Sequence, residues 1–165
     1  MTSAFEKLLA DLSEAGVDYI LVGGLALAFC GHIRATEDVD ILVQVDEENL
    51  ARLLKALAGF GEGSATELQV DDFTLEEGAV RVVEEFPLDI FTQMSGYRYE
   101  DLKSLTETRR VNDHPIRHLN IEGLIALKTL CAPKISWACR RSRPSRASKT
   151  AIKMFTPPQI NAAGP

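Results

Sequence analysis

The stretch VGGLALAFCGHIRATEDVDILVQV, residues 22–45, contains the residues that decide the fold. It ends in a segment in which valine and isoleucine alternate with Asp38, Asp40 and two further residues. Because successive side chains of a β-strand point to opposite faces, one face of this segment is apolar and belongs to a core. The other face begins with two carboxylates about 7 Å apart. Such a pair fits a solvated strand end, but it also predicts a site for a divalent cation.

A glycine pair, Gly23-Gly24, separates the apolar run 19–22 from the helix-compatible segment 25–29. Glycine lets backbone N–H groups approach a ligand closely. The start of a helix adds unpaired N–H donors and the positive end of a dipole, which suit phosphate. The pair therefore indicates either a phosphate-binding turn or an ordinary tight turn.

Arg34 and Thr36 precede the two aspartates at the same spacing of two residues. Gly-Gly followed by Arg-x-Thr-x-Asp-x-Asp resembles the signature of the nucleotidyltransferase superfamily related to DNA polymerase beta. More narrowly, it is similar to the small bacterial branch of minimal nucleotidyltransferases, abortive-infection-type toxins and antibiotic nucleotidyltransferases. The resemblance extends from about Val17 to Lys128, and its specific part is the arrangement of the glycines, Arg34, Thr36 and the acids.

This resemblance implies a metal-dependent enzyme that transfers a nucleoside monophosphate from an NTP, with ATP as one candidate, to a hydroxyl acceptor. It implies that Asp38 and Asp40 bind Mg²⁺ or Mn²⁺ and that Gly23 and Gly24 hold the triphosphate. It also implies that Arg34 and Thr36 belong to the nucleotide-binding residues. The acceptor stays open between a protein side chain, a tRNA end and a small molecule. Relatives often belong to toxin–antitoxin pairs, so a partner protein, either antitoxin or toxin, is expected.

A third acid, Asp89, lies in the centre of the short apolar segment 87–91. Phosphoryl transfer by two metal ions needs carboxylates from more than one strand, and a neighbouring strand would place Asp89 beside the first pair. In the resembled family a third acid lies on a later strand, and Asp89 is the position that matches. Its period-two apolar neighbours favour it, although the sequence also admits Asp71 or Asp72.

Lys128 follows Leu124 and Ile125 at helical spacing, in a helix that we expect to start at Ile121 with Asn120 as its cap. Its ammonium group is expected to reach inward to phosphate as an electrostatic helper. The guanidinium group of Arg34 is expected to help in the same way. A lysine at the edge of the apolar stripe, with its charge in water, is an equally good interpretation.

The remaining periodicity predicts an α/β domain with a small mixed β-sheet flanked by helices. Ser3 and Glu6 form a candidate capping box for the first helix, and Asp46 is a candidate cap for a later one. We expect a short helix within 97–105 and a hairpin around His114-Pro115. The expected strands are 17–22, 38–45, 79–83 and 87–91.

The charge is divided unevenly along the 165 residues. The net charge is −14 over residues 1–122 and +8 over residues 123–165. The acidic body is therefore a poor platform for nucleic acid. We expect a nucleotidyltransferase domain at 1–131 and a basic tail at 132–165 that is disordered or partly ordered. A frame change in the coding sequence and a basic arm that binds nucleic acid both account for the tail.

The sequence also suggests a compartment. Its three cysteines form no metal-ligand pattern and are expected to be reduced, as in a cytoplasmic protein. The longest apolar run has 12 residues, fewer than the about 20 that span a bilayer, and we expect neither a signal peptide nor membrane insertion. The rival to an enzyme is a non-catalytic module that binds a nucleotide or a partner and has a degenerate C-terminus.

Overall fold

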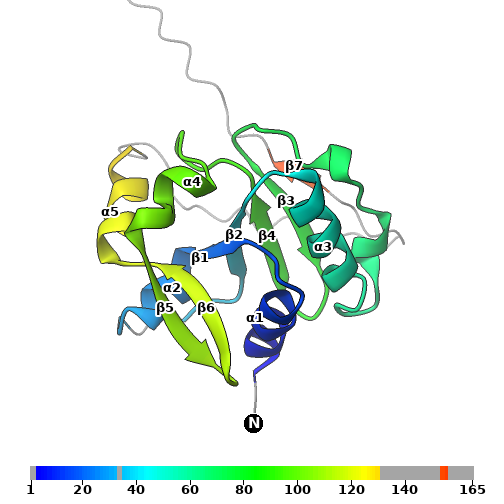
Figure 1. Ribbon diagram of the computed structural model, residues 1–165, viewed down its shortest axis with the longest axis horizontal. Helices are drawn as coiled ribbons and strands as arrows, with labels where there is room; N and C mark the ends of the chain where they lie inside the picture. Colours follow the sequence, from blue (N-terminus) through cyan, green and yellow to red (C-terminus); the bar gives the residue numbers. More distant parts are fainter. Residues whose placement is uncertain (1–2, 33–34, 131–152, 156–165) are drawn as a thin grey trace, which may run out of the picture.

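The computed structural model describes residues 3–32, 35–130 and 153–155. Its centre is a β-sheet with the strand order β5-β6-β1-β2-β4-β3-β7, which has helices on both faces (Figure 1). β1 pairs with β2 antiparallel, whereas β2 pairs with β4 parallel, so the sheet is mixed. This confirms the predicted architecture. The strands are β1 (Tyr19–Val22), β2 (Val39–Val43), β3 (Ala79–Val83), β4 (Pro87–Phe91), β5 (Thr106–Val111), β6 (His114–Leu119) and β7 (Lys153–Phe155).

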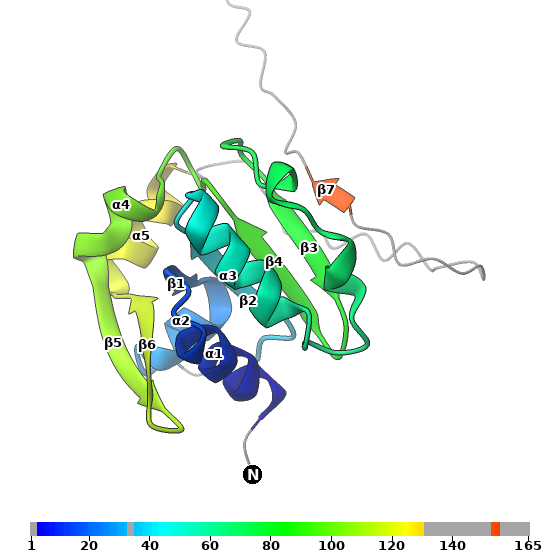
Figure 2. The same cartoon turned by 45° about the vertical axis from the view of Figure 1, so that its right-hand side comes forward.

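The helices form two layers around this sheet. In Figure 2, α1 and α3 lie in front of the sheet, and α2 and α5 lie behind it. The α-helices are α1 (Ala4–Glu14), α2 (Gly23–Phe29), α3 (Glu47–Leu57), α4 (Tyr99–Leu102) and α5 (Ile121–Leu130), and the 3-10 helices are η1 (Ser64–Glu67), η2 (Val70–Asp72) and η3 (Lys103–Leu105).

Local capping explains where α1 and α3 begin. The Ser3 hydroxyl accepts a hydrogen bond from the Glu6 backbone N–H, and the Glu6 carboxylate accepts one from the Ser3 backbone N–H, so the predicted capping box is confirmed. The Asp46 carboxylate accepts a hydrogen bond from the Asn49 N–H at 2.8 Å and caps α3. Both helices then turn leucines at helical spacing toward the sheet, where these side chains are buried.

The two central strands are shorter than expected and more deeply buried. β2 starts at Val39, so Asp38 stands just before the strand and Asp40 lies inside it. Leu42 follows on the same face as Asp40 and is fully buried. The carboxylates therefore stand at the edge of a packed apolar layer and not on an open polar face.

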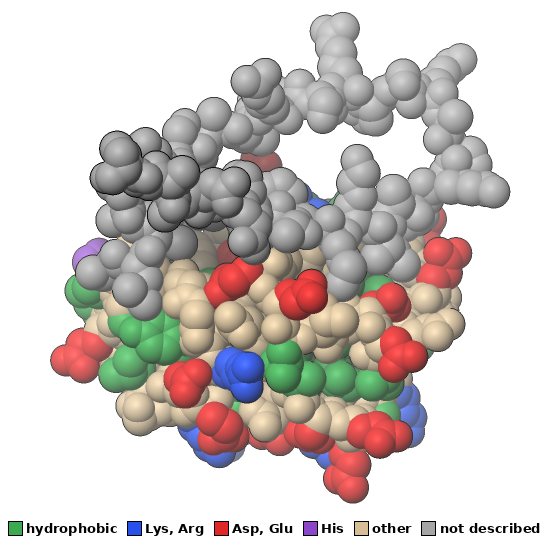
Figure 3. Space-filling view, turned by 90° about the horizontal axis from the view of Figure 1, so that it is seen from above, with side chains coloured by type: hydrophobic (Ala, Val, Ile, Leu, Met, Phe, Trp, Pro, Cys, Tyr) green, Lys and Arg blue, Asp and Glu red, His purple; other side chains and the backbone are tan. Residues whose placement is uncertain are grey.

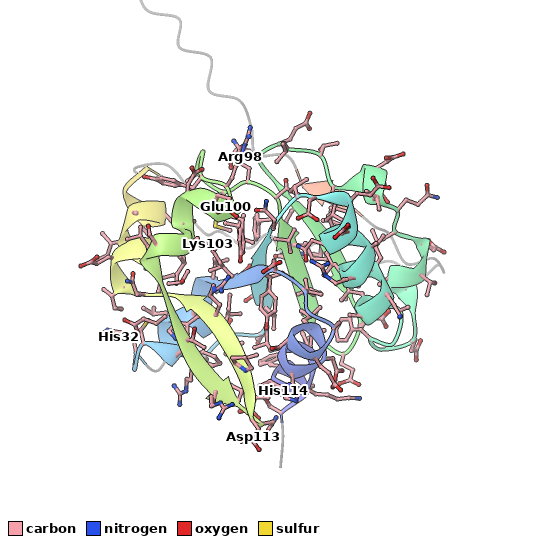
Figure 4. All side chains as sticks on the ribbon, in the orientation of Figure 1. His32, Arg98, Glu100, Lys103, Asp113 and His114 are labelled. Carbon is pink, nitrogen blue, oxygen red and sulfur yellow. The ribbon has the colours of Figure 1, made fainter. Side chains whose placement is uncertain are left out.

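The hairpin of β5 and β6 turns at a different place from the one predicted. Its turn residues are Asn112 and Asp113, with φ of 48° and 66°, and the prediction of a turn at His114-Pro115 is wrong. Asparagine and aspartate tolerate left-handed backbone better than most residues, whereas proline cannot adopt a positive φ. Figure 4 shows Asp113 and His114 at the tip of this hairpin. The expected helix within 97–105 is present only as α4 and the 3-10 turn η3.

Most of the basic tail, namely 132–152 and 156–165, lies outside the described residues, so the frame change and the basic arm that binds nucleic acid stay hypotheses. Its described part, β7, pairs antiparallel with the outer edge of β3. The sequence does not predict this strand, because the segment has no alternating pattern. Backbone hydrogen bonds at the free edge of a sheet can form without such a pattern. Within the described residues, no helix has the length and apolar character needed to cross a membrane.

Candidate metal and nucleotide site

Three carboxylates meet on one face of the sheet. Asp40 of β2 is the register partner of Asp89 on the parallel strand β4, and in-register residues on adjacent strands share a face. Asp38 lies two residues before Asp40. One oxygen from each of the three aspartates lies within 4.8 Å of the others. Sequence spacing grouped the first two, and the pairing of β2 with β4 adds the third.

The glycine pair packs directly against this acidic strand. Gly23 opens α2 with φ of +68°, and a Cβ placed on it would lie 2.0 Å from Asp40 Oδ2. A Cβ on Gly24 would lie 2.9 Å from Thr36 Oγ1. A side chain at Gly23 would thus meet both an unfavourable backbone conformation and a carboxylate oxygen. Glycine is therefore needed at position 23 for the backbone to lie against the acids, whether or not the turn binds a ligand.

Thr36 acts on Asp38. Its hydroxyl lies 2.8 Å from Asp38 Oδ1, to which it donates, and 3.2 Å from the Asp38 carbonyl oxygen. This contact holds one oxygen of the carboxylate and leaves the other for a ligand. The sequence grouped Thr36 with Arg34 as nucleotide-binding residues, and Arg34 lies outside the described residues.

The electrostatics of the cluster favour a cation. The pKa of Asp40 is raised to about 7, first because the carboxyl group is buried and then because the charges of Asp38 and Asp89 lie close. The nearby Arg81 opposes this shift. A hard divalent ion with oxygen ligands, such as Mg²⁺ or Mn²⁺, would relieve the repulsion, and the donor set fits such an ion.

Arg81 is the residue of the site that the sequence interpretation missed. It lies on β3 as the register partner of Asp89, and it binds that carboxylate through Nε at 2.6 Å and through a terminal nitrogen at 2.5 Å. A signal existed, because the two predicted strands 79–83 and 87–91 are close enough in sequence to form a hairpin. Pairing Val83 with Pro87 places Arg81 opposite Asp89.

Other predicted site residues lie elsewhere. Lys128 is exposed, and so is Ile125, with 56% of its surface accessible. Over residues 121–128, the buried residues of α5 are Gly123, Leu124 and Leu127, because Gly123 lies against the end of β6 and leaves no room for a side chain. The expectation that Lys128 emerges from a buried apolar stripe shared with Ile125 is therefore wrong.

The two alternatives to Asp89 take no part in the cluster, which among the described residues contains only Asp38, Asp40 and Asp89. Asp72 instead accepts a hydrogen bond from the Gln69 N–H at the start of η2. The wider surface agrees with the acidic balance of the body, since the face in Figure 3 carries more acidic than basic side chains among those drawn in colour.

Comparison with known proteins gives a family and a similar fold. The sequence profile of the family described as "Nucleotidyl transferase AbiEii toxin, Type IV TA system" matches residues 7–147. Comparison with curated proteins gives no match. Among solved structures, the fold is similar to that of a "putative nucleotidyltransferase" from Thermotoga maritima, with a TM-score of 0.50 and 14% sequence identity over 76% of this chain and 80% of that chain.

Proposed function

The chain belongs to the AbiEii family of nucleotidyl transferase toxins, and on that premise we propose that it transfers a nucleoside monophosphate from an NTP to a hydroxyl acceptor. The observation that carries the proposal is the convergence of Asp38, Asp40 and Asp89 within 4.8 Å beside the glycine turn. A buried carboxyl group such as that of Asp40, whose pKa is raised by burial and by two neighbouring carboxylates, weakens the fold unless a ligand neutralises its charge.

The three aspartates are the residues that would hold Mg²⁺ or Mn²⁺. When bound, the cation would neutralise charge on the phosphates and on the leaving pyrophosphate. Thr36 keeps the Asp38 carboxylate in place through its hydroxyl. The register between β2 and β4 places Asp89 directly beside Asp40 on the neighbouring strand.

The residues of the chain act by positioning and by charge. The backbone of Gly23 and Gly24 approaches the triphosphate closely, because neither residue has a side chain in the way. The acceptor hydroxyl attacks the α-phosphorus in line, the bond to the bridging oxygen breaks, and pyrophosphate leaves. Asp89 helps the hydroxyl to lose its proton as the new phosphorus–oxygen bond forms. Arg34, which is not among the described residues, remains a candidate electrostatic helper, and so does the exposed Lys128, which is not part of the cluster.

The family description names the toxin of a type IV toxin–antitoxin system. We infer that the chain is the toxin of such a pair and that an antitoxin opposes its activity. The acceptor is a protein, a tRNA or a small molecule. These three classes are separated by following radiolabel from an α-labelled NTP into protein, RNA and small-molecule fractions of a cell lysate.

The decisive experiment measures pyrophosphate release from each of the four NTPs with Mg²⁺ and lysate as the acceptor source. Wild type is compared with Asp40→Asn and with Asp71→Asn, a matched change at an acid outside the cluster. We expect release from wild type and Asp71→Asn, and a loss of at least about 100-fold in Asp40→Asn. Full activity in folded Asp40→Asn would refute the site. No release from folded wild type would favour the non-catalytic binding module.

A further inference from the structure

Arg81 forms a bidentate contact with Asp89, the third carboxylate of the cluster. The two contacts to Asp89, at 2.6 Å and 2.5 Å, join two nitrogens of one guanidinium to the two oxygens of one carboxylate. Paired contacts of this kind are the strongest form of the arginine–carboxylate interaction. The antiparallel register of β3 and β4 places the two residues opposite each other, so the backbone of the sheet sets the contact.

The two partners are unequal in exposure, and this decides what the pair can do. The Asp89 side chain is 7% exposed, whereas the Arg81 side chain is 50% exposed. A buried carboxylate that loses its counter-ion becomes an uncompensated charge, whereas an arginine at the surface can exchange its partner for water. The buried Asp89 carboxylate therefore needs a positive charge beside it, whereas the exposed Arg81 guanidinium does not need Asp89.

Both oxygens of Asp89 are engaged, and this separates it from the other two acids. Among the described residues, Thr36 occupies one oxygen of Asp38, and no hydrogen bond reaches the Asp40 carboxylate. A cation held by all three aspartates needs an oxygen of Asp89 that Arg81 currently binds. Each Asp89 oxygen keeps a second lone pair, so the cation and the guanidinium would share this carboxylate, and each positive charge would weaken the binding of the other.

We propose that Arg81 is a positioning residue that holds Asp89 in the cation-free site and competes with the cation for that carboxylate. The inference rests on the proposed function only in taking the three aspartates as the metal ligands. Arg81 keeps the site from losing its shape when it is empty, at the expense of cation affinity. It thereby sets how much free cation is needed to load the site.

The test measures Mn²⁺ binding to the full chain by electron paramagnetic resonance of the free ion, without any NTP. We expect Arg81→Gln to bind Mn²⁺ about tenfold more tightly than wild type, because Asp89 is released and the cluster loses the guanidinium that opposes the charge of the cation. Arg81→Lys keeps the charge but not the fork, and we expect it to bind about threefold more tightly. This second variant also serves if Arg81→Gln does not fold.

A double-variant comparison separates competition for Asp89 from the general effect of removing a positive charge. In an Asp89→Asn background the change Arg81→Gln should alter Mn²⁺ affinity less than about twofold. An equal gain in both backgrounds overturns the proposal, and so does unchanged or weaker binding in folded Arg81→Gln and Arg81→Lys.

The same data distinguish a failure of the proposed function. If Mn²⁺ binds wild type, is lost in Asp40→Asn and is unaffected by either Arg81 variant, only the role of Arg81 is wrong. If Mn²⁺ binds neither wild type nor any variant, the metal site itself is wrong, and both proposals fall.

Discussion

The two ends of the central strand pair β1–β2 differ in how their charged side chains are arranged, and we call them the crowded end and the paired end. At the end where Asp40 pairs with Val22, three carboxylates crowd together, and among the described residues only Arg81 forms an ion pair with one of them, Asp89. At the other end, Asp18 stands just before β1, and its carboxylate lies 3.6 Å from Arg52 and accepts a hydrogen bond from the Tyr99 hydroxyl at 3.4 Å. One end concentrates like charge, and the other end pairs opposite charges.

The paired end holds the fold together around a buried amide. The Asn49 side chain is fully buried and bonds three backbone groups, namely the N–H and the carbonyl of Asp18 and the carbonyl of Gln44. It thereby ties α3 to both strands. Polar groups with full hydrogen-bond partners stabilise the fold at one end, whereas the crowded acids lie at the end where we propose that a cation binds.

The largest effect is expected from Gly23→Ala, which breaks the crowded end. The new Cβ would lie 2.0 Å from Asp40 Oδ2 in a backbone with φ of +68°. We expect turnover to fall at least about 100-fold, because a carboxylate displaced by about an ångström no longer positions the reaction. The control is Gly31→Ala, which has a similar strain, with φ of +91°, and no neighbour within 4 Å of its Cβ. Equal losses in both variants would show that strain alone matters.

Asn49→Ala breaks the paired end. It leaves three partly buried backbone groups without their partner, so we expect the free energy of unfolding to fall by about 2–4 kcal/mol in urea titrations. Mn²⁺ affinity of the folded protein should be unchanged. Glu48→Ala is the control, because its side chain is 92% exposed and its ion pair with Arg52 is worth less than about 1 kcal/mol. Loss of Mn²⁺ binding in folded Asn49→Ala would contradict the expectation that the paired end stabilises the fold and the crowded end alone binds the cation.

The pH dependence of stability sharpens the contrast. The pKa of Asp40 is about 7 in the folded protein against 3.8 for the free group, so the folded state binds the proton more tightly. Without metal, stability should therefore rise by roughly 1–3 kcal/mol as the pH falls from about 8 to about 4.

Thermal unfolding of metal-free wild type and Asp40→Asn across this pH range tests the expectation. Asp40→Asn should show a flatter profile and greater stability than wild type at about pH 8. Added Mg²⁺ at about 100 times its Kd should stabilise wild type by about 2.7 kcal/mol and the variant by much less. Identical profiles for the two proteins would argue against the raised pKa.

The smallest effect is expected from Thr36→Val, which removes the hydroxyl bound to Asp38 and keeps the side-chain shape. We expect turnover to fall about fivefold, in line with the loss of one hydrogen bond of about 1 kcal/mol. The Mn²⁺ affinity should weaken, and the KM for NTP should stay near that of wild type. A raised KM with unchanged Mn²⁺ affinity would instead assign Thr36 to nucleotide binding. Thr108→Val, at an exposed position of β5, is the control.

Much of the site could be predicted because its signals are local. The glycine pair and the acids at spacing two occupy one stretch, and the apolar neighbours of Asp89 show a strand with an acid on its other face. The turn of the β5–β6 hairpin was predicted wrongly although its signal is local, because Asn112 and Asp113 tolerate a positive φ and Pro115 does not. The wrong prediction for Lys128 has another cause, since packing decides which face of α5 is buried. For Lys128, helical spacing alone did not reveal that Gly123, with no side chain, is the residue pressed against β6.

The sequence by itself determined the local elements and the chemistry, since periods of two and 3.6, caps and glycine turns act over a few residues. It therefore specified the helices with their caps, the central strands and three acids suited to a divalent cation. Only the tertiary structure decided which residues face one another across strands. Placing Asp89 beside Asp40 needs the parallel pairing of β2 with β4, and burying Asn49 between two strand ends needs α3 to dock. Such contacts join residues far apart in the chain, and no local pattern encodes them.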